Sequence, residues 1–321
     1  MRVFDGEAIR AAVPMADLLD AVEGAFGDVA AGRDRSPVRT RVPLPNGDLL
    51  LMTGLRDAGR GTAVKLVTVL PDNAARGLPT VQAVIAWFDG ASGEPLAVLD
   101  GTTITGMRTG AASGVATRLL ARPDASVLAL YGAGAQAAWQ VRAVCAARPI
   151  GSLRVYARNE SARGAFAAEM AAELGPGVDV VAAPSAQEAL RGADVVCCAT
   201  TSSTPIFDAD WVESGTHVNA VGAYRLDMIE LPPELFARAA VVAVDSRSAA
   251  LEEAGDLVAA LERGLLAPDG YVELGTVEAE WANRRDPDAI TVFKSVGLAI
   301  QDVAAAELIA GRLLGNADSG S

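Results

Sequence analysis

The chain has 321 residues, of which 51% are hydrophobic, and its formal net charge is −13. This length fits one large domain or two domains with buried cores. The acidic excess argues against nucleic acid or an anionic membrane as a partner, and no apolar run approaches the length of a membrane-spanning helix, about 20 residues.

The first part of the chain predicts a helix followed by sequential strands. Pro14 marks the first turn of a helix whose apolar positions repeat every three to four residues up to Gly32. After an arginine-rich connection, strands are predicted at 49–53, 61–69, 81–88 and 95–99, with short turns between them. Such a succession predicts an antiparallel sheet. A helix over 105–120 leads to a boundary at Arg122-Pro-Asp-Ala125.

The second part alternates strands and helices. Strands are predicted at 127–131, 153–157, 178–182, 194–198, 217–221 and 240–244, with helical segments between several of them. This rhythm predicts a parallel sheet of the Rossmann type. We expect the last helix, 301–314, to return to the first domain. The predicted fold is therefore α/β: a Rossmann domain over 123–300, and a discontinuous α+β substrate and dimerisation domain over 1–122 and 301–321.

A glycine-rich turn follows the first of these strands. Gly132 lets the chain reverse, Gly134 removes a side chain that would block a pyrophosphate, and Ala137 allows close packing of helix and strand. Ala135 and Gln136 begin a helix whose free N–H groups favour phosphate. This Gly-x-Gly-x-x-Ala pattern predicts a dinucleotide site, although a purely structural strand-turn-helix would look similar.

The end of the next strand carries Arg158 and Asn159, where an NAD-binding protein would place an acidic residue for the ribose. An arginine there can pair with a 2′-phosphate. NADPH is therefore the expected cofactor, with NADH possible; an ordinary solvent-exposed arginine is the alternative.

The cysteines and the single histidine point to no metal site or disulfide framework. Cys197 and Cys198 lie in an apolar strand and point to opposite faces, as small buried hydrophobic residues do. Cys145 stands alone, and we expect a cytoplasmic protein. His217 has no second histidine nearby and is expected in the core or at a strand end.

Three basic residues of the first domain are candidates for holding an anionic substrate. Lys65 stands among valines and leucines, so it needs either an anion partner or an exposed edge. Arg108 begins the helix before the nucleotide domain, where an interdomain ion pair is the alternative. Arg39 lies in the arginine-rich connection.

Motifs along nearly the whole chain resemble the ornithine cyclodeaminase and mu-crystallin family. They are Gly61-Thr-Ala-Val-Lys65, Leu70-Pro-Asp-Asn73, Gly77-Leu-Pro-Thr80, Gly93-Glu-Pro-Leu-Ala-Val-Leu-Asp-Gly101, Met107-Arg-Thr109, Gly132-Ala-Gly-Ala-Gln136, Val221-Gly-Ala223 and Ser295-Val-Gly297. The resemblance implies a homodimer formed through the sheet domain and a nicotinamide cofactor between the two domains.

Carried over by position, the family's residues fall into two groups. The resemblance implies that Arg39, Lys65 and Arg108 bind the substrate carboxylate, with Arg108 also near the cofactor. It implies further cofactor contacts at Thr80, Ala135, Gln136, Thr200, Val221 and Ser295.

Two departures separate this chain from true ornithine cyclodeaminases. By resemblance, Tyr224 occupies the position at which those enzymes share an aspartate. Leu50 occupies the position of the glutamate that would hold the distal amine of the substrate. The stretch resembles the ketimine reductase form instead, with an aspartate at Asp227, although the usual proline is Leu226. Asp227 is a candidate catalytic residue beside Lys65; capping of the following helix is the alternative.

The expected function is NADPH-dependent reduction of a cyclic or N-substituted α-imino acid, which in reverse is amino-acid dehydrogenation. Lys65 would bind the carboxylate and could donate a proton. Two alternatives stay open: an NAD-dependent, ammonia-releasing cyclodeaminase, and a protein that binds NADPH without catalysis.

Overall fold

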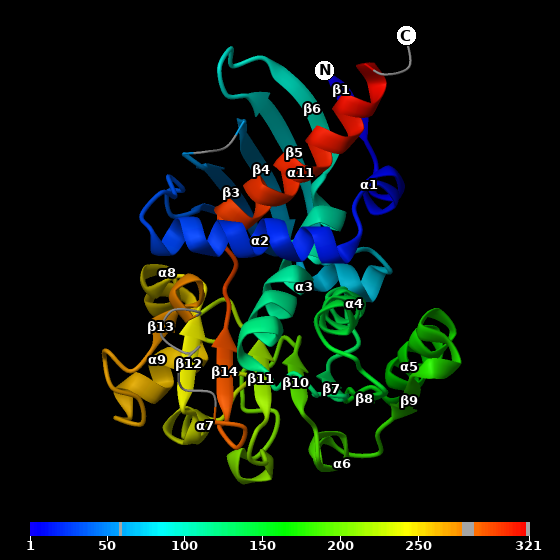
Figure 1. Cartoon of the computed structure of the whole chain (residues 1–321), viewed down its shortest axis with the longest axis vertical. Helices are drawn as coiled ribbons and strands as arrows, with labels where there is room; N and C mark the ends of the chain where they lie inside the picture. Colours follow the sequence, from blue (N-terminus) through cyan, green and yellow to red (C-terminus); the bar gives the residue numbers. More distant parts are fainter. Residues whose placement is uncertain (58–59, 278–285, 319–321) are drawn as a thin grey trace. The chain divides into compact units, whose positions relative to one another are not determined.

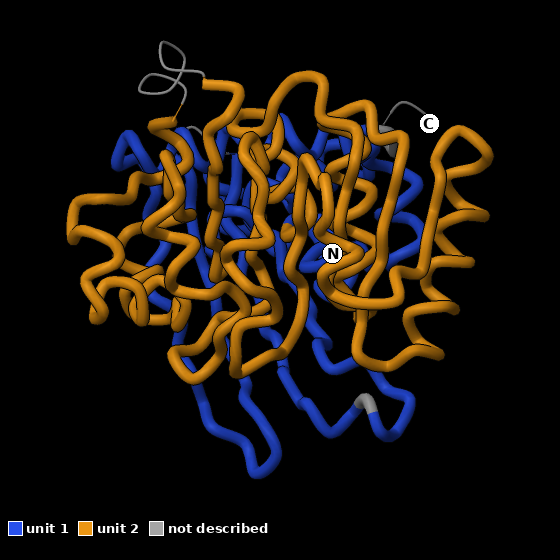
Figure 2. Tube along the Cα trace, turned by 90° about the horizontal axis from the view of Figure 1, so that it is seen from below, with its two compact units in different colours: residues 1–108, 298–321 blue, residues 109–297 orange. Residues whose placement is uncertain are grey.

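The computed structural model describes residues 1–57, 60–277 and 286–318. The chain forms two compact units (Figure 2): unit 1 is 1–108 with 298–321, and unit 2 is 109–297. The division lies at 108/109 and 297/298, whereas the sequence places it at 122/123 and 300/301. The first boundary falls inside helix α3 (Gly101–Leu120), which begins in one unit and ends in the other.

Unit 1 is built on a six-stranded sheet with the order β1-β6-β5-β4-β3-β2. Neighbours from β2 to β6 are antiparallel, as predicted, and β1 pairs parallel with β6. The strands are β1 (Arg2–Phe4), β2 (Thr40–Leu44), β3 (Gly47–Leu55), β4 (Gly61–Val69), β5 (Val81–Asp89) and β6 (Pro95–Asp100). The other elements are α1 (Gly6–Ala12), α2 (Met15–Ala30), η1 (Pro71–Arg76) and α11 (Ala299–Asp318).

One face of this sheet is buried because apolar residues alternate along its strands. Leu50, Met52, Val67 and Ile85 are all less than 9% exposed and share that face. Helix α11 lies against β3, β4 and β5, with α2 packed beside it (Figure 1). The last helix of the chain thus belongs to the core of unit 1.

Unit 2 contains an eight-stranded, wholly parallel sheet with the order β13-β12-β14-β11-β10-β7-β8-β9. The strands are β7 (Val127–Tyr131), β8 (Ser152–Tyr156), β9 (Asp179–Ala182), β10 (Val195–Cys198), β11 (His217–Ala220), β12 (Val241–Val244), β13 (Val272–Glu273) and β14 (Thr291–Lys294). The predicted fold class, a Rossmann domain with an antiparallel partner sheet, is confirmed.

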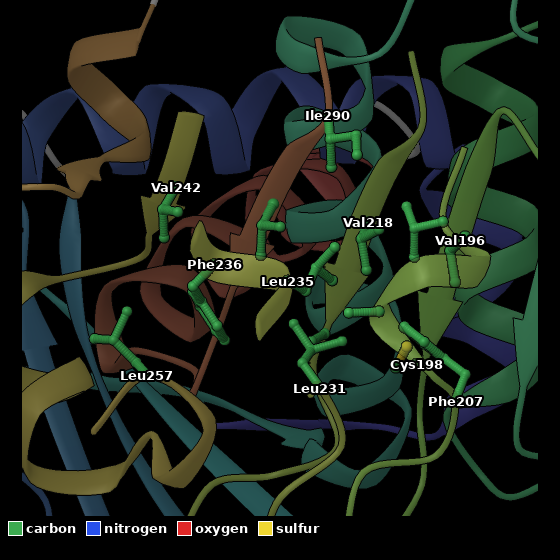
Figure 3. Close-up of a cluster of buried hydrophobic side chains, with 14 of the residues drawn as sticks. Val196, Cys198, Phe207, Val218, Leu231, Leu235, Phe236, Val242, Leu257 and Ile290 are labelled. Carbon is green, nitrogen blue, oxygen red and sulfur yellow. The ribbon is translucent and has the colours of Figure 1, made fainter. Parts of the chain in front are cut away.

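Helices cover both faces of the parallel sheet. On one face α4 and α5 pack in a cluster around Leu130 and Val195. On the other face Leu235 and Phe236 of α7 and Leu257 of α9 pack in one cluster with the strand residues Val196 and Val218 (Figure 3). The helices are α4 (Ala137–Ala147), α5 (Glu160–Leu174), α6 (Ala186–Leu190), α7 (Pro233–Arg238), α8 (Arg247–Glu253) and α9 (Gly255–Glu262), with the short turns η2 (Gly175–Gly177), η3 (Ala209–Trp211) and η4 (Leu274–Thr276).

The sulfur and imidazole groups of unit 2 are structural. Cys197 packs in one hydrophobic cluster and Cys198 in the other, and burial raises the pKa of both thiols, that of Cys197 to about 12. His217 is fully buried between the Thr291 hydroxyl and the Asn219 side chain, and burial lowers its pKa to about 3. It is a neutral core residue, as the sequence predicts.

Over the described ranges, no cluster of three or more His, Cys, Asp or Glu side chains is arranged to hold a metal ion. Among the helices of these same ranges, none has the length and apolar character to cross a membrane.

Candidate active site

Lys65 forms the centre of a buried ionic cluster in unit 1. It lies on the covered face of β4, paired in register with Met52 on one side and Ile85 on the other, and it is 2% exposed. Its ammonium donates to the Asp302 carboxylate, with Nζ to Oδ1 at 2.9 Å. The alternative of an edge-strand lysine pointing to water is therefore wrong.

Arg108 joins Lys65 on the same carboxylate oxygen. Its Nε lies 3.2 Å from Asp302 Oδ1, and its Nη1 donates to Gln301 Oε1 at 2.7 Å. Arg108 is 6% exposed, and its ion pair is made within unit 1. Arg39 is half-buried just before β2, close enough for its charge to act on Lys65. The structure thus brings Lys65 and Arg108 together on one carboxylate, with Arg39 within electrostatic range of Lys65.

The charges of this cluster shift the acidity of its members. Burial lowers the pKa of Lys65 to about 8; Asp302 opposes this change, whereas Arg108 and Arg39 add to it. Burial also raises the pKa of Asp302, but Arg108 and Lys65 outweigh that effect and hold it below its ordinary value. Lys65 can therefore change its charge near neutral pH, while Asp302 stays ionised.

The predicted cofactor residues of unit 2 lie along one edge of the parallel sheet. Gly132, Arg158, Thr200, Val221 and Ser295 each follow the carboxyl end of a strand, respectively β7, β8, β10, β11 and β14. These five strands are neighbours in the order β14-β11-β10-β7-β8. From β7 the chain runs outward through β8 to β9, and from β10 it runs to β11 in the opposite direction, so the strand order reverses between β7 and β10. Ligands of such sheets bind outside the carboxyl ends at this switch point.

The glycine-rich turn has the backbone that a pyrophosphate site requires. Gly132 has φ +107°, and a Cβ there would lie 2.5 Å from the carbonyl oxygen of Ala199. Gly134 is exposed, and a Cβ on it would meet nothing within 4 Å. The exposed Ala135 follows, and Gln136 is the N-cap of α4. The turn therefore leaves open space before a helix N-terminus, which fits a dinucleotide phosphate.

Two predicted cofactor residues lie just beyond β8. Arg158 is exposed, whereas the Asn159 side chain caps α5 by accepting from the Ala162 amide at 3.0 Å.

Thr80, another predicted cofactor residue, belongs to unit 1 and lies immediately before β5. Its carbonyl accepts from the Leu70 amide at 2.8 Å.

Glu230, which the sequence did not single out, ties two loops of the sheet edge together. Its Oε1 accepts from the Thr200 amide and hydroxyl at 2.6 and 2.8 Å, and its Oε2 from the Gly222 and Ala223 amides at 2.7 and 3.0 Å. Glu230 is fully buried. It therefore fixes the loops after β10 and β11, which carry Thr200 and Val221.

Two further buried aspartates complete this scaffold. Asp256 accepts from the backbone of Glu230 and pairs with Lys294, whose Nζ lies 2.8 Å away. Asp245 Oδ2 accepts from the Ser295 hydroxyl at 2.9 Å and from the amides of Val296 and Gly297. The side chain of Ser295 is thus engaged in holding its own loop.

Asp227 is not a helix cap. It lies in a turn, its side chain is 65% exposed, and its two oxygens pair with Arg225 at 2.9 and 2.6 Å. The next helix, α7, begins at Pro233 with Pro232 as its N-cap. The capping alternative is therefore wrong, because the chain continues through a bridge at Ile229 before that helix begins.

The amino-acid composition contains a signal that could have revealed the buried aspartates, which the sequence analysis did not single out. The sequence contains only two lysines, Lys65 and Lys294, and all its other basic residues are arginines. Both lysines lie in apolar strands, and both pair with a buried aspartate from a distant segment. An ammonium in such a strand requires a buried anion.

Comparison with known proteins agrees with this architecture. A model of the ornithine cyclodeaminase/mu-crystallin family matches residues 3–317. The chain belongs to this family. Among curated relatives, it is 38% identical to a Delta(1)-pyrroline-2-carboxylate reductase of Bacillus cereus over 96% of this chain and 95% of that one. It is 37% identical to the ketimine reductase mu-crystallin of Mus musculus over 91% and 90%.

Solved structures of the family have the same fold. The Delta(1)-pyrroline-2-carboxylate reductase of Thermococcus litoralis, in complex with NADH and L-proline, aligns with a TM-score of 0.93 and 36% identity over 99% of this chain and 98% of that one. An archaeal alanine dehydrogenase dimer with bound NAD aligns with a TM-score of 0.89 and 32% identity over 98% of both chains. The predicted kind of enzyme, a pyridine-nucleotide oxidoreductase acting on C=N, is confirmed within the imine reductase branch.

Proposed function

We propose that this protein reduces a cyclic α-imino acid with NADPH, and that Lys65, Arg108 and Arg39 bind the substrate carboxylate. One observation carries the proposal. Lys65 and Arg108 are both buried, and the carboxylate that pairs with them within the described residues is Asp302. Two positive charges against one negative charge leave an excess that a buried site must balance with an anion. A substrate carboxylate supplies it.

The proposed reaction needs a hydride and a proton. NADPH, when bound, would supply the hydride to the carbon of the C=N bond, and a proton would add to the nitrogen, giving the amino acid. The cationic cluster would fix the carboxylate, and with it the neighbouring carbon. Lys65 is the proposed proton donor, because its lowered pKa makes the ammonium a better acid. Asp227 is a second candidate catalytic residue: its carboxylate, which pairs with Arg225 in this structure, would orient Lys65 or a water.

The neighbours of Lys65 favour a substrate without a distal charge. Met52 and Ile85 flank Lys65 in the sheet, and the buried Leu50 lies two positions along on the same face, opposite Val67. None of them can hold an ammonium. A neutral ring, such as that of pyrroline-2-carboxylate or piperideine-2-carboxylate, matches this surface better than ornithine does.

The proposal is tested by following the absorbance of NADPH and NADH with three substrates: pyrroline-2-carboxylate, piperideine-2-carboxylate, and pyruvate with methylamine. We expect oxidation of NADPH with at least one cyclic substrate. Ammonia release from ornithine without net cofactor oxidation would identify a cyclodeaminase instead. Tight NADPH binding, seen by fluorescence, without turnover on any substrate would identify a non-catalytic protein.

The rate should depend on pH through Lys65. Its ammonium is the form that binds an anion and donates a proton, and its pKa is lowered to about 8. We therefore expect kcat/KM for the imino acid to fall about tenfold per unit as pH rises beyond this pKa, since kcat/KM reports the free enzyme. In Lys65→Arg, which stays charged, this break should disappear. If kcat/KM of Lys65→Arg instead falls at the same pH as in the unmodified protein, the titrating group belongs to the substrate.

Glu230 should matter for the cofactor rather than for the imino acid, given the proposed contacts at Thr200 and Val221. In Glu230→Gln an amide NH2 replaces one acceptor oxygen, so the loops after β10 and β11 lose part of their anchor. We expect the dissociation constant of NADPH to rise about tenfold, measured by fluorescence titration. Glu234→Gln on α7, an exposed carboxylate that pairs with Arg263, is the control. Unchanged NADPH affinity in a folded Glu230→Gln would contradict this expectation.

We also propose that the uncovered face of the unit 1 sheet forms a homodimer. Leu51, Leu66 and Val84 lie side by side across β3, β4 and β5 on the face opposite Lys65, and they are 38, 44 and 48% exposed. Val42 and Val3 lie on the same face two positions out of this row, where Val42 pairs with Leu49 on β3 and Val3 with Val98 on β6. A contiguous apolar surface of this kind favours association of two copies.

Leu66→Asp should therefore shift the protein from dimer to monomer in light scattering after size exclusion. The charge would lie at the middle of the proposed interface, where burial without a partner is costly. Leu251→Asp on α8, which is 49% exposed in unit 2, should leave the dimer intact. A dimer that persists in Leu66→Asp would place the interface elsewhere.

A further inference from the structure

The first turn of α11 supplies two adjacent polar side chains to the cationic cluster. Asp302 Oδ1 accepts from Lys65 Nζ and Arg108 Nε, and Gln301 Oε1 accepts from Arg108 Nη1 at 2.7 Å. Gln301 and Asp302 are 0 and 1% exposed. A residue pair from the end of the chain thus touches the heads of both buried cations.

We propose that Asp302 is a positioning residue for the reduction: with Gln301, it holds the Lys65 ammonium and the Arg108 guanidinium as one cationic pair that receives the substrate carboxylate. This inference rests on the proposed function. It goes beyond that function because it assigns the geometry of the anion site to a carboxylate that binds the two cations rather than the substrate.

Like charges explain why the site needs such a residue. Two buried cations repel each other, and an unpaired lysine side chain samples many rotamers. A single oxygen shared at 2.9 and 3.2 Å fixes both heads and offsets one of the two charges. The carboxylate of the substrate, bound by the same two cations, would then offset the remaining positive charge.

Unused hydrogen-bonding groups support a ligand at this place. Asp302 Oδ2 and Gln301 Nε2 are buried and make no hydrogen bond. Buried polar atoms are nearly always paired, so these two mark a place that a ligand or water completes. The Gln301 amide can donate to a substrate carboxylate, whereas Asp302 Oδ2 needs a donor such as a water molecule. Asp302 also lies in the first turn of α11, where the helix dipole stabilises its negative charge.

Asp302→Asn tests the assignment, because it keeps the shape and removes the charge. Three charged groups face Lys65: Asp302 on α11, Arg108 on α3, and Arg39 in the segment before β2. Of these, only Asp302 raises the pKa of Lys65 and so stabilises its charged form. Its loss should move the pH break in kcat/KM for the imino acid about one unit or more toward acid. The Michaelis constant for NADPH should stay within about twofold, because no cofactor contact is removed.

Glu307→Gln is the matched control on the same helix. Glu307 accepts from the Arg60 amide at 2.8 Å and pairs with Arg56, and it has no contact with Lys65. Its pH break should match that of the unmodified protein. The proposal is overturned if Asp302→Asn leaves the break unmoved, or if Glu307→Gln moves it equally.

A second measurement separates this inference from the proposed function. Because the chain has only two lysines, protein made with 13Cε-labelled lysine gives two side-chain signals, and Lys65→Arg identifies which is which. The titration of the Lys65 signal needs no substrate. An acid shift of this titration in folded Asp302→Asn supports the positioning role even if no imino acid is reduced. An unmoved titration overturns it even if reduction is observed.

Discussion

Lys65→Met is expected to lower kcat/KM for the imino acid by about 100-fold to 10,000-fold, the range in which loss of a positioned proton donor falls. The loss includes the cation that pairs with the substrate carboxylate. Asp302 keeps Arg108 as a partner, so no buried charge is left alone and the protein should fold. The measurement is NADPH oxidation at varied imino acid and saturating cofactor.

Lys65→Arg provides the comparison for this variant. It retains the charge but moves the donor atoms, so it should bind the carboxylate better than Lys65→Met while reducing the imine slowly. NADPH affinity, measured by fluorescence, should be the same in both. More than a tenth of the original kcat/KM in Lys65→Met would remove Lys65 from the proposed chemistry.

Arg158→Asp is expected to reverse the cofactor preference, with the Michaelis constant for NADPH rising about 10-fold to 100-fold and that for NADH changing little. The substitution removes a charge-assisted bond to the 2′-phosphate and places a negative charge beside it. Arg158 is exposed at the end of β8, so the fold should tolerate the change.

The control for charge is Arg191→Asp. Arg191 lies before β10 at the opposite edge of the parallel sheet, pairs with Glu188, and has a side chain that is 66% exposed. The same change in net charge there should leave both Michaelis constants as they were. If the unmodified protein uses NADH and NADPH equally well, Arg158 does not select the cofactor.

The sequence predicts the parallel strands β7 to β12 because long apolar runs mark strands that are buried on both faces, but it missed β13 and the inner strand β14. Val127–Tyr131 and Val195–Cys198 are uninterrupted apolar runs, and Gly132 stands where the backbone needs a positive φ. In unit 1, β1 and β2 were missed because their largely exposed residues give no pattern. Helix α3 begins at Gly101 rather than at 105, since Asp100 accepts from the Thr103 amide and so stabilises its first turn.

The candidate site was predicted only by its cations. Lys65 attracts attention because a charge interrupts an apolar strand. Its partner Asp302 is 237 residues away, and an aspartate at the start of an amphipathic helix looks like any solvent-facing residue. Glu230 and Asp256 likewise acquire their roles from loops that meet only in the folded chain. Long-range pairing of this kind leaves no local periodicity to detect.

The burial of both lysines also determines how the protein reacts with reagents that modify amines. Lys65 and Lys294 are 2 and 0% exposed, and each ammonium is held by an aspartate. Amine-coupled surfaces and bulky cross-linkers therefore find neither lysine exposed on the native protein. Lys294 lies outside the proposed anion site, so its modification would signal that the surrounding strand had opened, and the rate of that modification would measure local unfolding directly.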